Sequence, residues 1–319
     1  MEVELTEIEE KQSQTCEILN EESYFLSDPS RLAADPGLVE GDILGETYKS
    51  IKQKFKRPRI FLTAKIMKWI QWDDATVPFL ISSDYNIRER CLLAKAIKEL
   101  HNKTCIRFVP KEDFHREYLF IGPRFGANNC SSFVGCQRDG RQVLSLGSDC
   151  LKGREIGYIL HELLHALGVV HEHSRDDRDD YIKILWNNVD KKFEDNFQKY
   201  QKRHIDTFDE PYDFKSVMHY PPNAFSRDSS KPTIVPRKKT GYRNVVIGQR
   251  KGLSEIDIRK LNKLYECKSH LPSSSEECTD LNNHWCRYWK RLNYCSDKRW
   301  EKGLKNFCPL TCFSCNITD

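Results

Sequence analysis

The chain has 319 residues, and 51 Lys and Arg against 47 Asp and Glu give it a formal net charge of +4 at pH 7. Its basic residues are scattered rather than clustered, which gives no argument for a nucleic-acid partner, and no stretch approaches the roughly 18 consecutive apolar residues of a transmembrane segment. The length is enough for one full-sized core and a small satellite. Thirteen cysteines favour a disulfide-bonded, secreted protein over a cytosolic one.

Residues 1–59 are polar, charged and weakly periodic, which is typical of a leader rather than a folded domain. The N-terminus reads MEVELTEIEEKQSQTCEIL; it is acidic and contains no apolar h-region, so no signal peptide is visible. This conflicts with the cysteine count, to which we give more weight. Two explanations stay open: the start of the chain is incomplete or misassigned, or export is unconventional.

Residues 60–267 are expected to form the main domain. Short runs rich in Val, Ile, Leu and Phe predict β-strands over 77–82, 105–110, 117–122 and 142–146. A helix is predicted between the first two of these strands, with an apolar face made of Ile87, Cys91, Ala94, Ile97 and Leu100. A closing helix is predicted near the end of the domain, where it is suggested by Ile256, Leu261, Leu264 and Tyr265. Strands with packed helices predict an α+β lobe.

The most informative segment reads HELLHALGVVHEHSRDDRDDY and begins at His161. His165 follows four residues later, which places both imidazoles on one face of a helix, and Glu162 points about a quarter-turn away. Gly168 allows the helix to end, and the chain then brings back His171 as a third nitrogen ligand. Three protein ligands and one open position are typical of a catalytic zinc. A bare HExxH often arises by chance, whereas the complete HExxHxxGxxH is far more specific.

The complete motif is the metzincin signature, and its continuation resembles the astacin branch, in which a glutamate, here Glu172, follows the third histidine. Further matching residues are His173, Arg175, Asp177, Arg178, Asp179 and Tyr181. The segment Ser216-Val217-Met218-His219-Tyr220 is similar to the family's Met-turn. The resemblance implies a two-lobed α+β catalytic domain with a zinc ion at the floor of an active-site cleft, where Met218 and Glu172 have structural roles.

The resemblance also implies an endopeptidase mechanism. Glu162 would be the general base, and Tyr220 would ligate zinc at rest and then hydrogen-bond the tetrahedral oxyanion. A structural hydrogen bond is the alternative for Tyr220. Arg250 is similar to a residue that lines the S1′ pocket in acid-preferring members, which implies a preference for Asp or Glu after the scissile bond. An ordinary surface arginine is the alternative.

A second motif lies in the leader. Val39-Glu40-Gly41-Asp42 resembles the family's propeptide motif FxGD, with Val39 in place of Phe. The resemblance implies that Asp42 ligates zinc only in a zymogen, where it displaces the water. A plain Gly-Asp turn is the alternative.

The basic run KQKFKRPR, residues 52–59, predicts activation by a trypsin-like protease that cuts after Arg59 and frees Ile60. By the same resemblance, the new amino group is expected to pair with Glu172. A buried carboxylate needs such a partner, because an unpaired buried charge is costly.

The cysteines of the main domain fit the same family. Two disulfides are implied by the resemblance: Cys105–Cys267 and Cys130–Cys150. Cys91 and Cys136 are additional to the family pattern, and a third bridge between them stays open. Cys16, in the leader, is the odd one out.

After a linker over 268–277, six cysteines fall within residues 278–315, a segment too short to bury an adequate core without disulfides. The ending CxxxCxxC resembles a ShKT module, whose connectivity implies Cys278–Cys315, Cys286–Cys308 and Cys295–Cys312; a zinc site is the alternative. Channel-blocking ShKT peptides carry Lys-Tyr where this chain has Lys302-Gly303. An exosite or matrix-binding appendage is therefore favoured.

These observations predict a secreted, zinc-dependent endopeptidase that is made as a latent zymogen and acts on proteins or peptides. Sequons at Asn102, Asn129 and Asn316 are consistent with secretion. Two other classes stay open: a catalytically inactive binding protein and a toxin-like channel ligand. The complete set of zinc ligands and Glu162 argues against the first, and Gly303 argues against the second.

Overall fold

The structure is a computed structural model that divides into two compact units, Met1–Lys268 and Ser269–Asp319. In the first unit it describes residues 25–26, 38, 40–44, 70–123, 130–153, 155–200, 206–237 and 245–267. In the second unit it describes residues 286–287, 290–291, 294–296, 308 and 311–312. The predictions that fall outside these residues concern Cys16, Val39, residues 52–60, Cys278, Cys315, Asn129, Asn316, Lys302 and Gly303.

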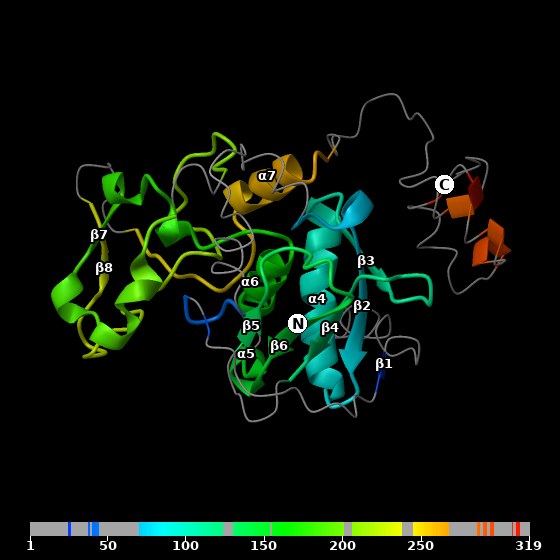
Figure 1. Cartoon of the computed structure of the whole chain (residues 1–319), viewed down its shortest axis with the longest axis horizontal. Coiled ribbons are helices and arrows are strands. Elements are labelled where there is room, and N and C mark those ends of the chain that lie inside the picture. Colours follow the sequence, from blue (N-terminus) through cyan, green and yellow to red (C-terminus); the bar gives the residue numbers. More distant parts are fainter. Residues whose placement is uncertain are drawn as a thin grey trace, which may run out of the picture. The chain divides into compact units, whose positions relative to one another are not determined.

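The first lobe is built on a six-stranded sheet (Figure 1). Its strands are β1 (Phe25–Leu26), β2 (Thr76–Ser82), β3 (Arg107–Pro110), β4 (Tyr118–Gly122), β5 (Cys130–Ser132) and β6 (Arg141–Leu146). The order is β1-β2-β4-β6-β5, with β3 also paired to β2. The paired strands are parallel except for β5, which runs antiparallel to β6 at the edge. All four predicted strands are confirmed, with ends that differ by one or two residues.

Two long helices pack on this sheet, α4 (Ile87–Lys103) and α6 (Gly157–Ala166), and share one hydrophobic core with it. A capping box between Asn86 and Glu89 fixes the start of α4. The predicted helix is confirmed, but the placing of Ile87 on its inner face is wrong, because this side chain is 55% exposed. The buried face is centred near Leu93, and Ile87 lies just beyond its edge, in the first turn of the helix.

Most of the chain that follows α6 forms the second lobe, which is largely irregular. Its one described sheet pairs β7 (Ile182–Ile184) with β8 (Ile234–Pro236) in antiparallel fashion. These strands pack with Phe197, Tyr212 and Tyr220 in a second hydrophobic cluster. The remaining short elements are α5 (Ser148–Leu151) and the 3-10 turns η2 (Asp73–Ala75), η3 (Glu172–Ser174), η4 (Arg178–Asp180), η5 (Trp186–Asn188), η6 (Lys191–Phe197) and η8 (Tyr294–Ser296).

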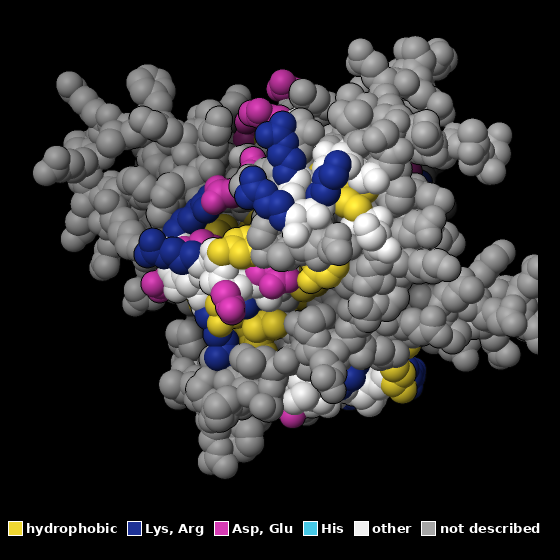
Figure 2. Space-filling model, turned by 90° about the vertical axis from the view of Figure 1, so that its right-hand side faces the viewer, with side chains coloured by type: hydrophobic (Ala, Val, Ile, Leu, Met, Phe, Trp, Pro, Cys, Tyr) yellow, Lys and Arg dark blue, Asp and Glu magenta, His cyan; other side chains and the backbone are white. Residues whose placement is uncertain are grey.

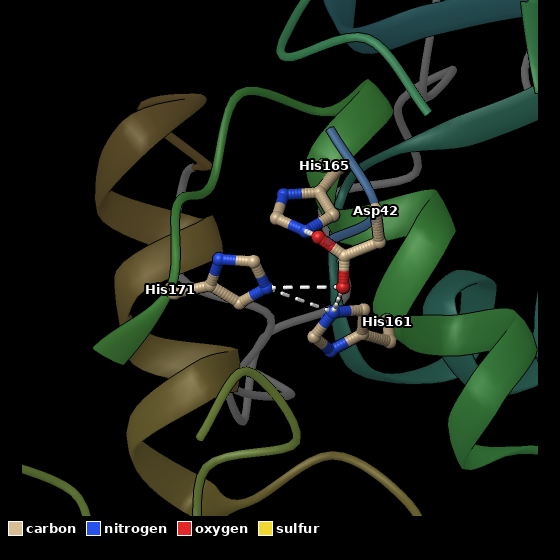
Figure 3. Close-up of side chains that lie close together, drawn as sticks. All are labelled: Asp42, His161, His165 and His171. Atoms are coloured by element: carbon tan, nitrogen blue, oxygen red, sulfur yellow. Dashed lines mark hydrogen bonds and ion pairs between the residues drawn. The ribbon is translucent and has the colours of Figure 1, made fainter. Parts of the chain in front are cut away.

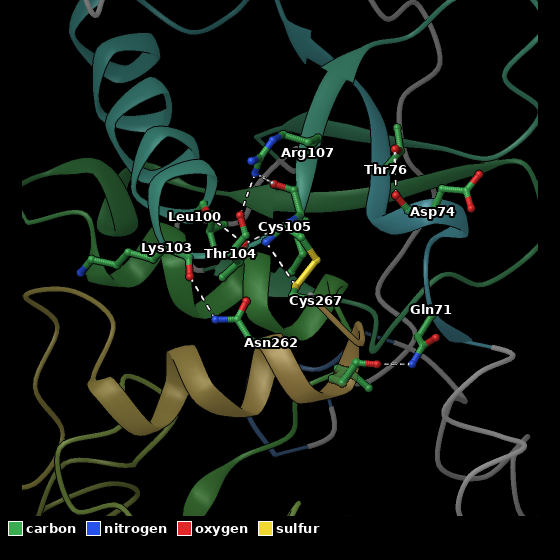
Figure 4. Close-up of a disulfide and its surroundings, with 12 residues drawn as sticks. Gln71, Asp74, Thr76, Leu100, Lys103, Thr104, Cys105, Arg107, Asn262 and Cys267 are labelled. Atoms are coloured by element: carbon green, nitrogen blue, oxygen red, sulfur yellow. Dashed lines mark hydrogen bonds between the residues drawn. A yellow bond between two sulfur atoms is a disulfide. The ribbon is translucent and has the colours of Figure 1, made fainter. Parts of the chain in front are cut away.

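The closing helix is confirmed as α7 (Glu255–Leu264), which packs Leu261 into the core of the first lobe. Its C-terminal end is tied to the end of α4 by the Cys105–Cys267 disulfide (Figure 4). The Asn262 side chain supports this join by donating to the carbonyl of Lys103 over 3.1 Å. The closing helix is therefore fixed to the first lobe both by burial and covalently.

The other described cysteines follow the expected pattern with one exception. Disulfides join Cys130 to Cys150 in the first unit, and Cys286 to Cys308 and Cys295 to Cys312 in the second. The bridge that stayed open between Cys91 and Cys136 does not form. Cys91 is disulfide-bonded, whereas the Cys136 thiol is free and buried in the first core.

The described surface mixes both signs of charge. Figure 2 shows Lys and Arg side chains beside Asp and Glu on one face. Ion pairs are also present, such as those of the Glu210 carboxylate with Arg259 at 2.8 Å and with Lys263 at 2.6 Å. Among the residues that the structure describes, no helix has both the length and the apolarity to cross a membrane.

Candidate zinc site

Three histidines and one carboxylate converge in the first unit (Figure 3). His161 and His165 project from α6, and His171 returns after the turn that ends this helix. Gly168 has a φ of +101°, so the predicted helix-ending glycine is in place. The fourth group is Asp42 of the leader, and one ligand atom from each of the four residues lies within 4.8 Å of the others.

The donor atoms of this cluster fit a zinc ion. Asp42 Oδ2 lies 3.0 Å from His161 Nε2 and 3.2 Å from His171 Nε2. Among the described residues, His165 Nε2, Asp42 Oδ1 and Glu162 Oε2 are buried and have no hydrogen-bond partner. Orphaned buried polar atoms are costly, and a metal ion would give ligand atoms their partner. Three imidazole nitrogens and one carboxylate oxygen are a donor set that suits tetrahedral zinc.

Each imidazole is oriented through its Nδ1 atom. The three acceptors are Val217 O for His161 at 2.8 Å, Val169 O for His165 at 2.8 Å, and Glu40 Oε2 for His171 at 2.6 Å. With the proton on Nδ1, the lone pair of Nε2 is free to bind a metal. Two acceptors are backbone carbonyls of the chain that follows α6, whereas the third is a side chain of the leader.

Burial and the close contact of these groups shift the pKa values of the carboxyls and of His171. Burial raises the pKa of Glu162 well above its ordinary value, and the charge of Asp42 raises it further. Burial also raises the pKa of Asp42, but the charge of His171 and the hydrogen bonds of His161 and His171 hold it well below its usual range. Burial lowers the pKa of His171, yet Asp42 and Glu40 raise it to about 9. A cation at the centre would stabilise this arrangement.

The Met-turn is anchored by α7. Ser216 Oγ donates to Asp257 Oδ1 over 2.6 Å, and Val217 N donates to Asp257 Oδ2 over 2.9 Å. The carbonyl of the same Val217 orients His161, and Met218 is fully buried in the first core. Sequence analysis did not single out Asp257; its only local sign is the capping box that it forms with Ser254.

Glu172 is fully buried and already has cationic partners. Its Oε1 accepts from Arg175 Nη1 at 3.0 Å and from Asp213 N at 2.9 Å, and its Oε2 accepts from Lys260 Nζ at 2.5 Å. Pairing with the amino group of Ile60 stays a prediction, because Ile60 lies outside the described residues. In this form of the chain, Lys260 and Arg175 balance the carboxylate.

Tyr220 lies beside the zinc ligands and is held by the leader. Its ring stacks on His173 with a centroid distance of 3.7 Å, and its hydroxyl donates to the Glu40 carbonyl. Burial raises the pKa of Tyr220 well above 10, as do the charges of Asp42 and Glu40, so the hydroxyl keeps its proton as a donor. Sequence analysis named His173 as a motif match but missed its contact with Tyr220.

Arg250 lies beside the start of α6, the helix that carries His161 and His165. Gly157 N donates to Arg250 O over 3.0 Å, and a Cβ at Gly157 would lie only 2.0 Å from that oxygen. The guanidinium donates to His219 O over 3.1 Å and lies 5.7 Å from the centre of the Tyr158 ring. Burial lowers the pKa of Arg250, and the charge of Asp42 opposes this effect. The guanidinium is therefore in the electrostatic field of the site.

Comparison with known proteins gives a consistent result. Residues 64–266 match the model of the peptidase family described as Astacin, and residues 277–315 match that described as ShK domain-like. The chain is 44% identical over 231 residues to zinc metalloproteinase nas-4 of Caenorhabditis elegans, which covers 72% of this chain and 69% of that protein. It is 36% identical over 330 residues to zinc metalloproteinase nas-8 of Steinernema carpocapsae, which covers 91% of this chain and 75% of that protein.

A solved structure agrees with these sequence matches. It is high choriolytic enzyme 1, a hatching enzyme zinc-protease from the medaka fish Oryzias latipes. It aligns with a TM-score of 0.55 and 35% identity, over 62% of this chain and 94% of that chain.

Proposed function

Because the chain belongs to the astacin family of zinc metalloendopeptidases, we propose that it is made as a latent enzyme, whose leader must be removed before it cuts proteins or peptides. The observation that carries this proposal is the position of Asp42, whose carboxylate lies among the three histidines where a fourth ligand of zinc is expected. A carboxylate in that place excludes the water that peptide hydrolysis needs.

The proposed mechanism assigns a role to each residue of the site. His161, His165 and His171 would hold the zinc ion, which would supply a Lewis acid for the scissile carbonyl and would lower the pKa of a water molecule at the site toward about 7. Glu162 takes the proton from this water and returns it to the leaving amine, a contribution of about 10²- to 10⁴-fold. Tyr220 donates a hydrogen bond to the developing oxyanion once the leader has left. Met218 supports the site through the core of the first lobe.

The leader contacts more than the zinc position, which supports latency. Leu44 N donates to Ser132 O over 2.8 Å, and Ser132 N donates to Asp42 O over 3.0 Å, so the leader pairs with the edge strand β5. The Glu40 carbonyl also accepts a hydrogen bond from the Tyr220 hydroxyl. We propose that a trypsin-like protease releases this segment by cutting after Arg59, and that Glu172 then pairs with the amino group of Ile60.

Domain division and substrate preference complete the proposal. Residues 1–59 would be the propeptide, 60–267 the catalytic domain, 268–277 a linker and 278–315 a ShKT-like exosite or matrix-binding module. The described disulfides support secretion, because such bonds persist in oxidising compartments. The partly buried guanidinium of Arg250, in the field of Asp42, supports a preference for Asp or Glu after the scissile bond.

The test uses the unprocessed chain, limited trypsin followed by trypsin inhibitor, and quenched peptides with Asp or Ala after the scissile bond. We expect cleavage only after trypsin, its loss with a zinc chelator, and a loss of about 10²-fold or more in Glu162→Gln, which keeps the zinc ligands. Arg250→Gln should reduce the preference for Asp, whereas Arg259→Gln, which changes an exposed arginine paired with Glu210, should not. Equal activity before and after trypsin would rule out latency, and no turnover of a mixed peptide library by a zinc-loaded chain would favour the binding-protein alternative.

A further inference from the structure

We propose that Glu40 is a positioning residue of the zinc site: its carboxylate holds His171 in the ligating orientation, so the leader helps the latent chain to acquire and keep its metal. This inference rests on the proposed latency. It adds a second role for the leader, because a segment that blocks the enzyme would also complete the site around the ion.

The contact between Glu40 and His171 is close and secluded. Glu40 Oε2 lies 2.6 Å from His171 Nδ1, and the two side chains are 7% and 0% exposed. On the other side of the same ring, His171 Nε2 lies 3.2 Å from Asp42 Oδ2. The imidazole is therefore held between two carboxylates of the leader, one facing the metal position and one facing away from it.

His171 depends on this contact more than the other two histidines depend on theirs. His161 and His165 lie on α6 and bond backbone carbonyls of the catalytic domain, which remain after the leader has gone. His171 lies outside any helix, with extended backbone angles of φ −61° and ψ 137° just before η3. In the described structure, its Nδ1 bonds the side chain of Glu40.

The backbone of the leader is fixed where the carboxylate is needed. Glu40 has a φ of +52°, a left-handed conformation that a residue other than glycine keeps only when its surroundings determine it. Its carbonyl accepts from the hydroxyl of Tyr220. The next residue, Gly41, also has a positive φ, and a Cβ there would lie 2.5 Å from the ring of Phe225. Glycine would suit the backbone of position 40 better, so the glutamate side chain has a reason of its own to be there.

Carboxylates in this position act on the metal through the histidine. They fix the tautomer and the ring orientation and increase the basicity of the ligating nitrogen, and their loss typically weakens metal binding by about 10- to 100-fold. We therefore expect a zinc dissociation constant about 10- to 100-fold higher for unprocessed Glu40→Gln than for the unprocessed wild type.

The experiment measures zinc affinity by competition with a chromophoric chelator, on the full chain before and after trypsin. Glu40→Gln keeps the size of the side chain, and Glu40→Gly relaxes the backbone; both should weaken zinc binding before cleavage. After the leader is cut off and removed, wild-type and variant chains are identical and should bind zinc equally, which controls for damage to the fold. Equal affinity of wild type and Glu40→Gln before cleavage would overturn the proposal, as would tighter binding by Glu40→Gly.

A second background separates the two leader carboxylates. If Glu40 acts through His171, Glu40→Gln should weaken zinc binding by a similar factor when Asp42→Asn is also present. Disappearance of the effect in that background would mean that Glu40 merely aligns Asp42, and would contradict the proposal. Because affinity is read on the uncleaved chain, a failure of trypsin to produce activity would refute latency and leave this result unaffected.

Discussion

The disulfide between Cys105 and Cys267 spans a sequence separation of 162 residues and holds α7, the helix that carries Asp257 and Lys260 (Figure 4). In the chain-entropy account, a cross-link stabilises by restricting the unfolded chain, and a loop of that length corresponds to about 5 kcal/mol at 25 °C. The Cys130–Cys150 disulfide spans a separation of only 20 residues, which corresponds to about 3 kcal/mol in the same account. The predicted difference between the two bonds is about 2 kcal/mol.

The assay is equilibrium unfolding in urea of the unprocessed chain carrying Glu162→Ala, which prevents self-cleavage. The Cys105→Ser/Cys267→Ser variant should lose about 2 kcal/mol more free energy of unfolding than Cys130→Ser/Cys150→Ser. Against a typical total of about 5–15 kcal/mol, that is a large fraction of the stability. Cys136→Ser removes a free buried thiol without opening a loop and controls for the substitution itself.

The outcome that refutes this reasoning is equally concrete. A loss below about 1 kcal/mol for the longer loop would mean that burial alone holds α7 and that loop entropy is not the source of stabilisation. A larger loss for the shorter loop would mean that local packing around the bonds, rather than loop length, sets their contribution.

Three further predictions concern single sites. Burial raises the pKa of Asp257 from 3.8 to about 6, so the folded state binds the proton of this carboxyl more tightly than the unfolded state does. Protonation of Asp257 therefore adds up to about 3 kcal/mol to the free energy of unfolding at low pH, and this contribution is lost as the pH rises from about 4 to 6. Asp257→Asn should flatten the free energy of unfolding over that window, and an unchanged pH profile would contradict the assignment. Gly157→Ala places a Cβ against Arg250 O and should cost about 1–3 kcal/mol in urea unfolding; wild-type stability would disprove the clash. Glu172→Gln leaves the buried charge of Lys260 without its partner and should lower the free energy of unfolding by about 3–5 kcal/mol. Adding Lys260→Met should restore part of this loss, and no recovery of stability would argue against the ion pair.

The zinc ligands could be predicted from the sequence because their geometry is local. His165 follows His161 by four positions, so one helical turn fixes their relation, and Gly168 supplies the turn that returns His171. The role of Asp42 could be predicted only from the resemblance of residues 39–42 to a family motif. The contact of Glu40 with His171 spans 131 residues, and no periodicity or spacing reports on a contact of that range.

The misses have physical causes of the same kind. The wrong placing of Ile87 came from taking one edge of a helical stripe for its centre, which only the packing of α4 could correct. Of the two cationic partners of Glu172, Lys260 lies on α7 and is 88 residues away along the chain. The free thiol of Cys136 could not be predicted either, because a spacing between cysteines does not determine their distance in the fold.

Because the Met-turn contributes residues to both hydrophobic cores, the effect of a core substitution on the site depends on which core it changes. Val217 and Met218 are embedded in the first hydrophobic core, and Tyr220, two residues later, belongs to the second. A cavity in the second core, for instance at Phe197, whose ring centre is 6.1 Å from that of Tyr220, would loosen the hydroxyl and leave the metal in place. A substitution in the first core should therefore lower the metal content, whereas a substitution in the second core should lower turnover while the metal content stays unchanged.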